Sequence, residues 1–253
     1  MTSKNLFVIS YSDTLNKEAS QFAKGIDLPF YGSIKATSEH IKSLEDTYFL
    51  VYSRERIFLK KGFKNSNPIF CNFLEWSKQS YKSLLLKAFK GIPENSTVID
   101  VTAGLGKDSL VISSLAKKLL LVERIPWVCA LLEDGINRFY KEIPDFNKIE
   151  VICEDSNKYL DSLKLGPEVI YIDPIFGINT RSKAKKDLQA LRDLTNLGNT
   201  GKLLNKSLSH ATNRVIVKRH KKSSFLEDIK PTFSLESRII IYDIYQTEST
   251  LLT

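Results

Sequence analysis

The pattern of apolar and polar positions along the chain changes near Pro93. After that residue, short apolar runs alternate with stretches of helical spacing, which is typical of a parallel sheet covered by helices on both faces. The apolar runs predict strands at residues 97–101, 118–122, 148–153, 169–172 and 214–217. The stretches between them predict helices at about residues 107–115, 126–140 and 183–194, with Pro126 in the first turn of the second.

Two further apolar runs, residues 232–235 and 238–245, close the pattern and are separated only by Glu236 and Ser237. A parallel crossover needs about a dozen residues or more, so this link predicts an antiparallel hairpin. We therefore expect an α/β fold, with a Rossmann-like parallel sheet that ends in a C-terminal antiparallel hairpin.

The segment before Pro93 is less regular. It predicts a strand at residues 6–9 and a hairpin whose strands are residues 48–52 and 57–59, around a polar turn. We expect a small N-terminal α+β domain at residues 1–92, a candidate for docking RNA, and a larger ligand-binding domain at residues 93–253.

The first predicted strand of the larger domain runs into a turn that contains Gly104 and Gly106. Glycine allows backbone torsions and a close ligand approach that a side chain would block. A Walker phosphate loop would need glycine at Val101 and serine or threonine at Asp108, so the sequence excludes this ATPase motif. A dinucleotide loop would need a third glycine at Ser109, and Asp108 would repel a pyrophosphate, which disfavours NAD.

Acidic residues at the predicted strand ends favour S-adenosylmethionine, a nucleotide-like ligand with an ammonium group and no phosphate. Asp100 can approach the ammonium. Glu123 follows Gly104 by 19 positions, close to the offset of about 20 at which a carboxylate meets ribose hydroxyls. Asp155 and Ser156, after the third strand, either contact the adenine or cap the next helix.

The fourth predicted strand ends in Asp173-Pro174-Ile175-Phe176. This segment resembles the (Asn/Asp)-Pro-Pro-(Tyr/Phe) motif of amino-group methyltransferases, with Ile175 in place of the second proline. The lone pair of a base amine is delocalised into the ring, so attack on a methyl group needs acceptors that hold its N–H groups. The Asp173 carboxylate and the Pro174 carbonyl are such acceptors, and Phe176 can stack on the base. We expect direct displacement that requires no metal; the alternative is an Asp-Pro turn with Phe176 in the core.

The formal net charge of +8 indicates a polyanionic partner, because lysine and arginine release counterions from phosphate backbones. Charge alone does not choose between RNA and DNA. The basic residues are dense after the Asp-Pro motif and at the end of the fifth strand, and our candidates for RNA contact are Arg181, Lys183, Lys185, Lys186, Lys218 and Arg219.

No apolar run approaches the ~18 residues that cross a bilayer, so we expect a cytoplasmic protein without a membrane partner. The three cysteines, Cys71, Cys129 and Cys153, contain no Cys-x-x-Cys pair and indicate neither a disulfide framework nor a zinc site. We therefore expect no bound metal.

The string from Asp100 to Asp108, together with Glu123-Arg124 and the segment from Asp173 to Phe176, resembles the bacterial 16S ribosomal RNA guanine-N2 methyltransferase family. The resemblance spans about residues 48–245. It implies a class I methyltransferase fold, S-adenosylmethionine as the cofactor, and transfer to the 2-amino group of a guanine in 16S ribosomal RNA or the small ribosomal subunit. The positions that match the family's cofactor contacts are Lys107, Asp108, Glu123, Arg124, Asp155, Ser156 and Asp173.

Three other functions remain open at this point. The first is an amino-methyltransferase that acts on DNA adenine or on a protein, because the same motif would serve it. The second is a nicotinamide-dependent oxidoreductase, which would use the same strand and glycine turn. The third is a non-catalytic ribosome-assembly factor with a vestigial site.

Overall fold

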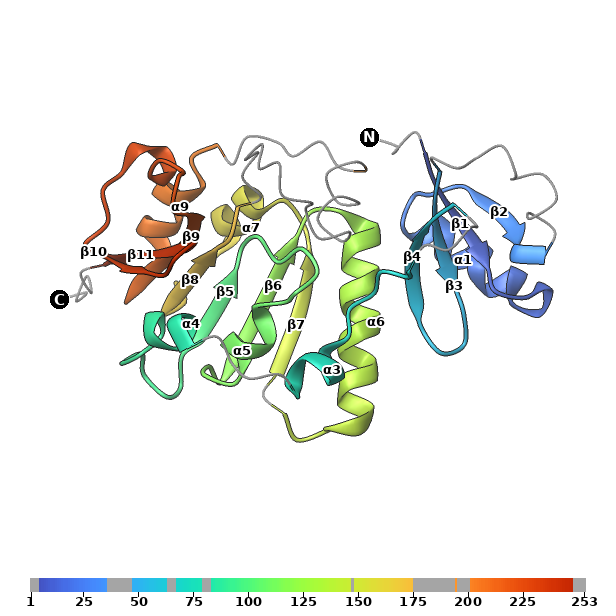
Figure 1. The fold of residues 1–253 in the computed structure, drawn as a ribbon, viewed down its shortest axis with the longest axis horizontal. Coiled ribbons are helices and arrows are strands. Elements are labelled where there is room, and N and C mark those ends of the chain that lie inside the picture. Colours follow the sequence, from blue (N-terminus) through green and yellow to red (C-terminus); the bar gives the residue numbers. More distant parts are fainter. Residues whose placement is uncertain are drawn as a thin grey trace. The chain divides into compact units, whose positions relative to one another are not determined.

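The computed structural model describes residues 5–35, 47–62, 67–78, 83–146, 148–174, 194 and 201–247. The chain forms two compact units (Figure 1). One contains the described residues up to Asn72 together with Pro126–Arg138, and the other contains Phe73–Ile125 and the described parts of Phe139–Asn179 and Asn199–Thr253. Among these residues, no helix is both long and apolar enough to cross a membrane.

The first unit contains a four-stranded sheet in the order β2-β1-β3-β4. Its strands are β1 (Leu6–Ser10), β2 (Phe30–Ser33), β3 (Tyr48–Tyr52) and β4 (Ile57–Lys61). The predicted strand at residues 6–9 and the predicted hairpin are confirmed, since β3 and β4 pair antiparallel. The helix α1 (Asn16–Gly25) and its 3-10 turn (Asp13–Leu15) connect β1 to β2. Neither this helix nor β2 was predicted.

The second unit contains a seven-stranded sheet in the order β10-β11-β9-β8-β5-β6-β7 (Figure 1). Its strands are β5 (Thr97–Asp100), β6 (Lys118–Glu123), β7 (Lys148–Cys153), β8 (Val169–Ile172), β9 (Arg214–His220), β10 (Phe233–Glu236) and β11 (Ile240–Gln246). The first five run parallel, and β11 runs antiparallel to both β9 and β10. The predicted Rossmann-like sheet with a C-terminal hairpin is therefore confirmed.

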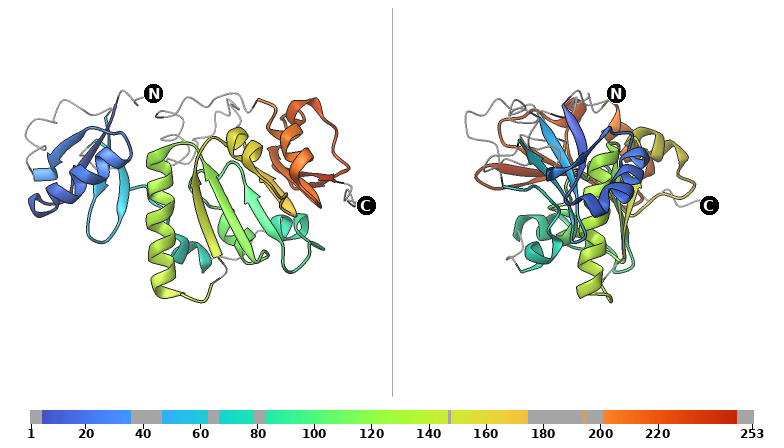
Figure 2. Two further views of the ribbon diagram at one scale, coloured as in Figure 1. Left: turned by 180° about the vertical axis from the view of Figure 1, so that it is seen from behind. Right: turned by 90° about the vertical axis from the view of Figure 1, so that its right-hand side faces the viewer.

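Helices alternate with the parallel strands of this sheet along the chain, as the pattern predicts (Figure 2). Besides α1, the helices in the described residues are α3 (Phe73–Ser77), α4 (Ser83–Ala88), α5 (Ser109–Ser113), α6 (Pro126–Glu142), α7 (Ser156–Ser162) and α9 (Leu203–His210), with a 3-10 turn at Leu226–Asp228. Most of α6 belongs to the first unit. The predicted helix at residues 126–140 is confirmed with Pro126 in its first turn, and the one at 107–115 is shorter than expected. The one at residues 183–194 lies outside the described residues, apart from position 194.

The core of the second unit lies on both faces of its sheet, because successive side chains on a strand point to opposite faces. Ile99 and Ile170 pack on one face against Leu160 of α7 and Leu204 of α9. Tyr171 points to the other face, where its ring centroid lies 6.1 Å from that of Phe89, just after α4.

A buried ion pair joins β9 to β11. Arg219 donates from Nε and Nη2 to the two carboxylate oxygens of Asp243, and from Nη1 to the Ser223 carbonyl at 2.9 Å. The two residues are 7% and 0% exposed. The side chain of Arg219 is enclosed by Asp243 and the Phe225 ring, and it joins two strands of the sheet. The predicted contact of Arg219 with RNA stays a prediction.

We predict that Asp243→Asn lowers the free energy of unfolding by about 3–5 kcal/mol, because it leaves a buried guanidinium without its counter-charge. Urea unfolding measures the change. The matched control is Lys221→Met at the end of β9, whose ion pair with Glu236 is about half exposed and whose loss changes stability by at most ~1 kcal/mol. Equal changes in the two variants would contradict this account of Arg219.

Candidate active site

Three acidic residues lie at the carboxyl edge of the seven-stranded sheet. Asp100 ends β5, Glu123 ends β6, and Asp173 directly follows β8. These strands are parallel, so their carboxyl ends lie at one edge. The chain continues from β5 to β6 on one side but pairs β8 on the other, so this edge contains the point where the strand order reverses. Open α/β sheets bind their ligands there.

The glycine turn after β5 is fastened to β6 by Glu123. Gly104 and Gly106 have φ values of +52° and +72°, the left-handed region that favours glycine. The Gly104 N–H donates to Glu123 Oε2 at 3.0 Å, and the Ile125 N–H donates to Oε1 at 3.0 Å. Burial raises the pKa of Glu123, and these bonds oppose the rise. Hydrogen bonds within the protein therefore join the predicted glycine turn to Glu123.

Asp100 is a buried carboxylate, 3% exposed, at the start of the same turn. Its Oδ1 accepts from the Thr102 N–H at 2.9 Å and from the Thr102 hydroxyl at 3.3 Å, and its Oδ2 accepts from Ser109 at 3.4 Å. Burial, with smaller contributions from the charges of Asp173 and Asp108, raises the pKa of Asp100 to about 7. A cation beside Asp100 would favour its ionised form.

Thr102 links the glycine turn to the Asp-Pro motif, a role that the sequence did not reveal. Its hydroxyl oxygen accepts from the Asp173 N–H at 2.6 Å. The same hydroxyl donates to Asp100, so a single side chain bridges the ends of β5 and β8. The backbone of Asp173 is therefore held at the turn.

Lys218 of β9 lies between two carboxylates. Its Nζ is 2.6 Å from Asp108 Oδ2 and 2.6 Å from Asp173 Oδ2. Asp108 Oδ2 also accepts from the buried Tyr171 hydroxyl at 2.8 Å. Lys218 was predicted to contact RNA, and Asp108 to contact the cofactor. The structure brings both into one network with Asp173, which the sequence did not indicate.

The remaining predicted positions have different surroundings. Asp155 is the N-cap of α7, where its Oδ1 accepts from two backbone N–H groups. Ser156 donates to the Val101 carbonyl at 2.6 Å. The helix-capping alternative thus describes Asp155, while its contact with adenine stays a prediction. Lys107 and Arg124 are exposed, and Lys107 Nζ lies 5.9 Å from the Trp76 ring centroid.

Part of the predicted site lies outside the described residues. Pro174 is described and buried. The positions that are not described are Phe176, Arg181, Lys183, Lys185 and Lys186.

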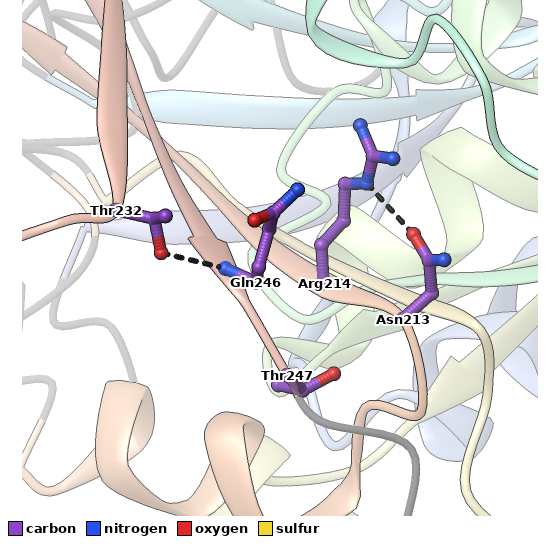
Figure 3. A pocket seen from close by; sticks show the side chains of 5 residues that line it. All are labelled: Asn213, Arg214, Thr232, Gln246 and Thr247. Carbon is purple, nitrogen blue, oxygen red and sulfur yellow. Dashed lines mark hydrogen bonds between the residues drawn. The ribbon is translucent and has the colours of Figure 1, made fainter.

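A pocket of about 420 Å³ lies beside β9 and β11. Figure 3 shows the five residues that line it. It is lined by Asn213, Arg214, Thr232, Gln246 and Thr247. Arg214 begins β9, whereas Lys218 lies four residues further along the same strand, towards the carboxyl edge. The pocket therefore lies near the start of β9, whereas the acids lie at the carboxyl edge of the sheet, near the other end of this strand.

The charge at the carboxyl edge suits a cationic ligand. Asp100, Asp108 and Asp173 are close enough for their charges to influence one another, and Lys218 contacts two of them. When Asp100 is ionised, three carboxylates with one ammonium leave a net negative charge that a positive ligand would balance. Among the described residues, no group of three or more histidine, cysteine, aspartate or glutamate side chains is arranged to hold a metal ion.

Comparison with known proteins identifies the relatives of this chain. A family model described as "Putative SAM-dependent methyltransferase" matches residues 35–247. A protein named ribosomal RNA small subunit methyltransferase J from Buchnera aphidicola is 36% identical over 78% of this chain and 82% of its own length. One of the same name from Coxiella burnetii is 29% identical over 94% and 95%. The crystal structure of a SAM-dependent methyltransferase from Neisseria gonorrhoeae has a similar fold, with a TM-score of 0.70, 20% identity and 97% coverage of both chains.

The raised pKa of Asp100 predicts a pH-dependent stability for the protein without ligand. Between about pH 4 and 7 the folded Asp100 keeps a proton that the unfolded chain releases, so its contribution is fully present below pH 4 and is lost as the pH rises to about 7. In urea unfolding, the wild type should lose up to ~1.4 kcal/mol per pH unit more than Asp100→Asn across this window. Parallel pH profiles for the two proteins would contradict the assignment, since the other titrating groups are common to both.

Proposed function

This chain belongs to the SAM-dependent methyltransferase family, together with the proteins named ribosomal RNA small subunit methyltransferase J, and from that membership we propose that it methylates the 2-amino group of a guanine in small-subunit ribosomal RNA. The observation that supports this acceptor most strongly is the position of Asp173. Its N–H bonds to Thr102 and its carboxylate bonds to Lys218, so an acceptor of N–H groups is fixed beside the cofactor turn.

The described residues fit S-adenosylmethionine. The buried Asp100 suits its ammonium group, and Glu123, already bonded to Gly104, has acceptor capacity for ribose hydroxyls. When bound, this cofactor supplies a methyl group on a positively charged sulfur. The other positions that we propose for its site are Gly106, Lys107, Asp108, Arg124, Asp155, Ser156 and Asp173.

In the proposed reaction, residues of this chain hold the amine that accepts the methyl group. Asp173 and the Pro174 carbonyl accept its N–H groups, which lets the nitrogen lone pair localise and point at the methyl group. Asp173 is 37% exposed at its side chain, so a base brought from outside can reach it. A base paired inside a helix would have to be splayed out first.

We propose that the backbone of the substrate is held by the basic residues that follow the motif. Lysine and arginine neutralise phosphates, and four such residues occur in the short run from Arg181 to Lys186. The net charge of +8 supports a polyanionic substrate. Because the proposed substrate is ribosomal RNA, we place the protein in the cytoplasm.

A second acceptor class shares the same motif. An amino-methyltransferase that acts on DNA adenine or on a protein would also use Asp173 and Pro174. The relatives named for ribosomal RNA favour the RNA substrate.

We expect methyl transfer to small-subunit particles taken from a strain that lacks this protein. The particles and, in a separate reaction, duplex DNA are incubated with labelled S-adenosylmethionine, and the labelled nucleotide is identified by mass spectrometry. Label on the 2-amino group of a guanine agrees with the proposal. Label in duplex DNA alone, or on another atom of the RNA, would overturn it.

The variant Asp173→Ala should lower kcat by about 100-fold, because the N–H groups of the amine lose a fixed acceptor. Single-turnover kinetics on the same particles measures the loss. Asp161→Ala on α7 is the matched control, since its carboxylate is 62% exposed and pairs with Lys206. Full activity in the Asp173 variant would remove Asp173 from the proposed mechanism.

A further inference from the structure

Lys218 is the link between the cofactor turn and the proposed acceptor site. Its side chain is 17% exposed, and its ammonium lies 2.6 Å from one oxygen of Asp108 and 2.6 Å from one of Asp173. Asp108 is itself fixed, since it is 6% exposed and accepts from Tyr171. A mostly buried ammonium with two carboxylate partners has a well-defined position.

The sheet register brings Lys218 to this point. Val217 of β9 pairs with Ile172 of β8, so the next residues on the two strands are Lys218 and Asp173. On its other side, Lys218 pairs with Tyr242 of β11. Lys218 of β9 therefore lies beside Asp173, the residue that immediately follows β8.

Lys218 places a positive charge directly beside the Asp173 carboxylate, which also has other carboxylates near it. Among the described residues, the titratable and charged groups that face Asp173 are Asp100, Asp108, Lys218, Tyr171 and Tyr242. The two other carboxylates oppose a negative charge on Asp173, and the ammonium favours it. Burial alone would lower the pKa of Lys218, but the charges of Asp173 and Asp108 outweigh burial and raise it, so the ammonium keeps its proton.

The ionisation of Asp173 bears on which base it can hold. An ionised carboxylate only accepts hydrogen bonds, and it has about four lone-pair positions, more than the Lys218 bond uses. The Watson–Crick edge of guanine presents two adjacent donors, N1–H and the 2-amino group. Adenine and cytosine present an amino group next to a ring nitrogen that carries a lone pair. A carboxylate pairs with the guanine edge through both donors, whereas it meets a lone pair on the other two.

We propose that Lys218 is a positioning residue that keeps Asp173 as an acceptor-only group, and that this pair selects guanine by its adjacent N1–H and 2-amino donors. The inference rests on the proposed function, because it concerns the same acceptor site. It assigns a specificity role to two charges on neighbouring strands.

The test uses small-subunit particles reconstituted on RNA that carries either guanine or 2-aminopurine at the mapped position. 2-Aminopurine keeps the 2-amino group but has a lone pair at N1 in place of the N1–H. We expect the wild-type protein to methylate the guanine particles at least ~100-fold faster, because a site built for two donors rejects an analogue that lacks one. Equal rates on the two particles would overturn the inference.

Variants separate positioning from a general structural role. Lys218→Met should lower kcat on guanine particles by about 10-fold or more with KM for the particles within ~3-fold, and Lys218→Arg should recover part of the loss, since the charge is retained. Asp173→Asn, which replaces one acceptor oxygen by an NH2 donor group, should reduce the preference for guanine over 2-aminopurine. Lys221→Met is the control with an exposed lysine on the same strand end.

The outcomes distinguish this inference from the proposed function. If the wild-type protein transfers no methyl group to guanine particles, the proposed function fails. If it methylates guanine but Lys218→Met keeps its kcat, or Asp173→Asn keeps the wild-type base preference, the proposed function stands and the inference fails. If Lys218→Met does not fold, as shown by its thermal unfolding, the wild-type comparison of the two bases and the Asp173→Asn preference still decide.

Discussion

Strands β5 and β8 pair in parallel although the chain forms β6 and β7 between them, and the candidate active site depends on this pairing. It pairs Asp100 with Tyr171, so that Asp173, two residues further on, lies at the same carboxyl edge of the sheet as Asp100. The Thr102 hydroxyl then bonds to both residues, so the cofactor turn and the Asp-Pro motif form one unit. One hydrogen bond thus joins Thr102 and Asp173, which are 71 positions apart in the sequence.

The site also concentrates charge in a way that works against stability. The negative charges of Asp100, Asp108 and Asp173 repel one another. Lys218 forms ion pairs with Asp108 and Asp173. Burial makes the ionised form of Asp100 costly. Such an arrangement is retained at ligand sites because a bound positive group relieves the repulsion, so part of the folding free energy is given up for binding.

Local pattern was sufficient to predict the strands of the seven-stranded sheet, the glycine turn and the offset of Glu123 from Gly104, because these depend on neighbouring residues. It missed β2 of the first unit. Contacts between distant strands were not predictable. The bonds of Thr102 and Lys218 depend on the register of β5, β8 and β9, which local pattern does not encode. Lys218 and Arg219 are adjacent basic residues, and the sequence predicted the same role for both. They point to opposite faces of β9, where Lys218 contacts Asp173 and Arg219 forms a buried ion pair with Asp243.

The placement of β11 between β9 and β10 gives the site an order of assembly. During synthesis, β5 to β9 emerge before β11 exists, so β9 is an edge strand and Arg219 lacks Asp243 while the chain is still growing. The strand that carries Lys218 gains its second neighbour only when Ile240–Gln246 is available to pair with it. A protein proposed to modify ribosomes thus completes its own sheet only after the ribosome has made and released its β11 strand.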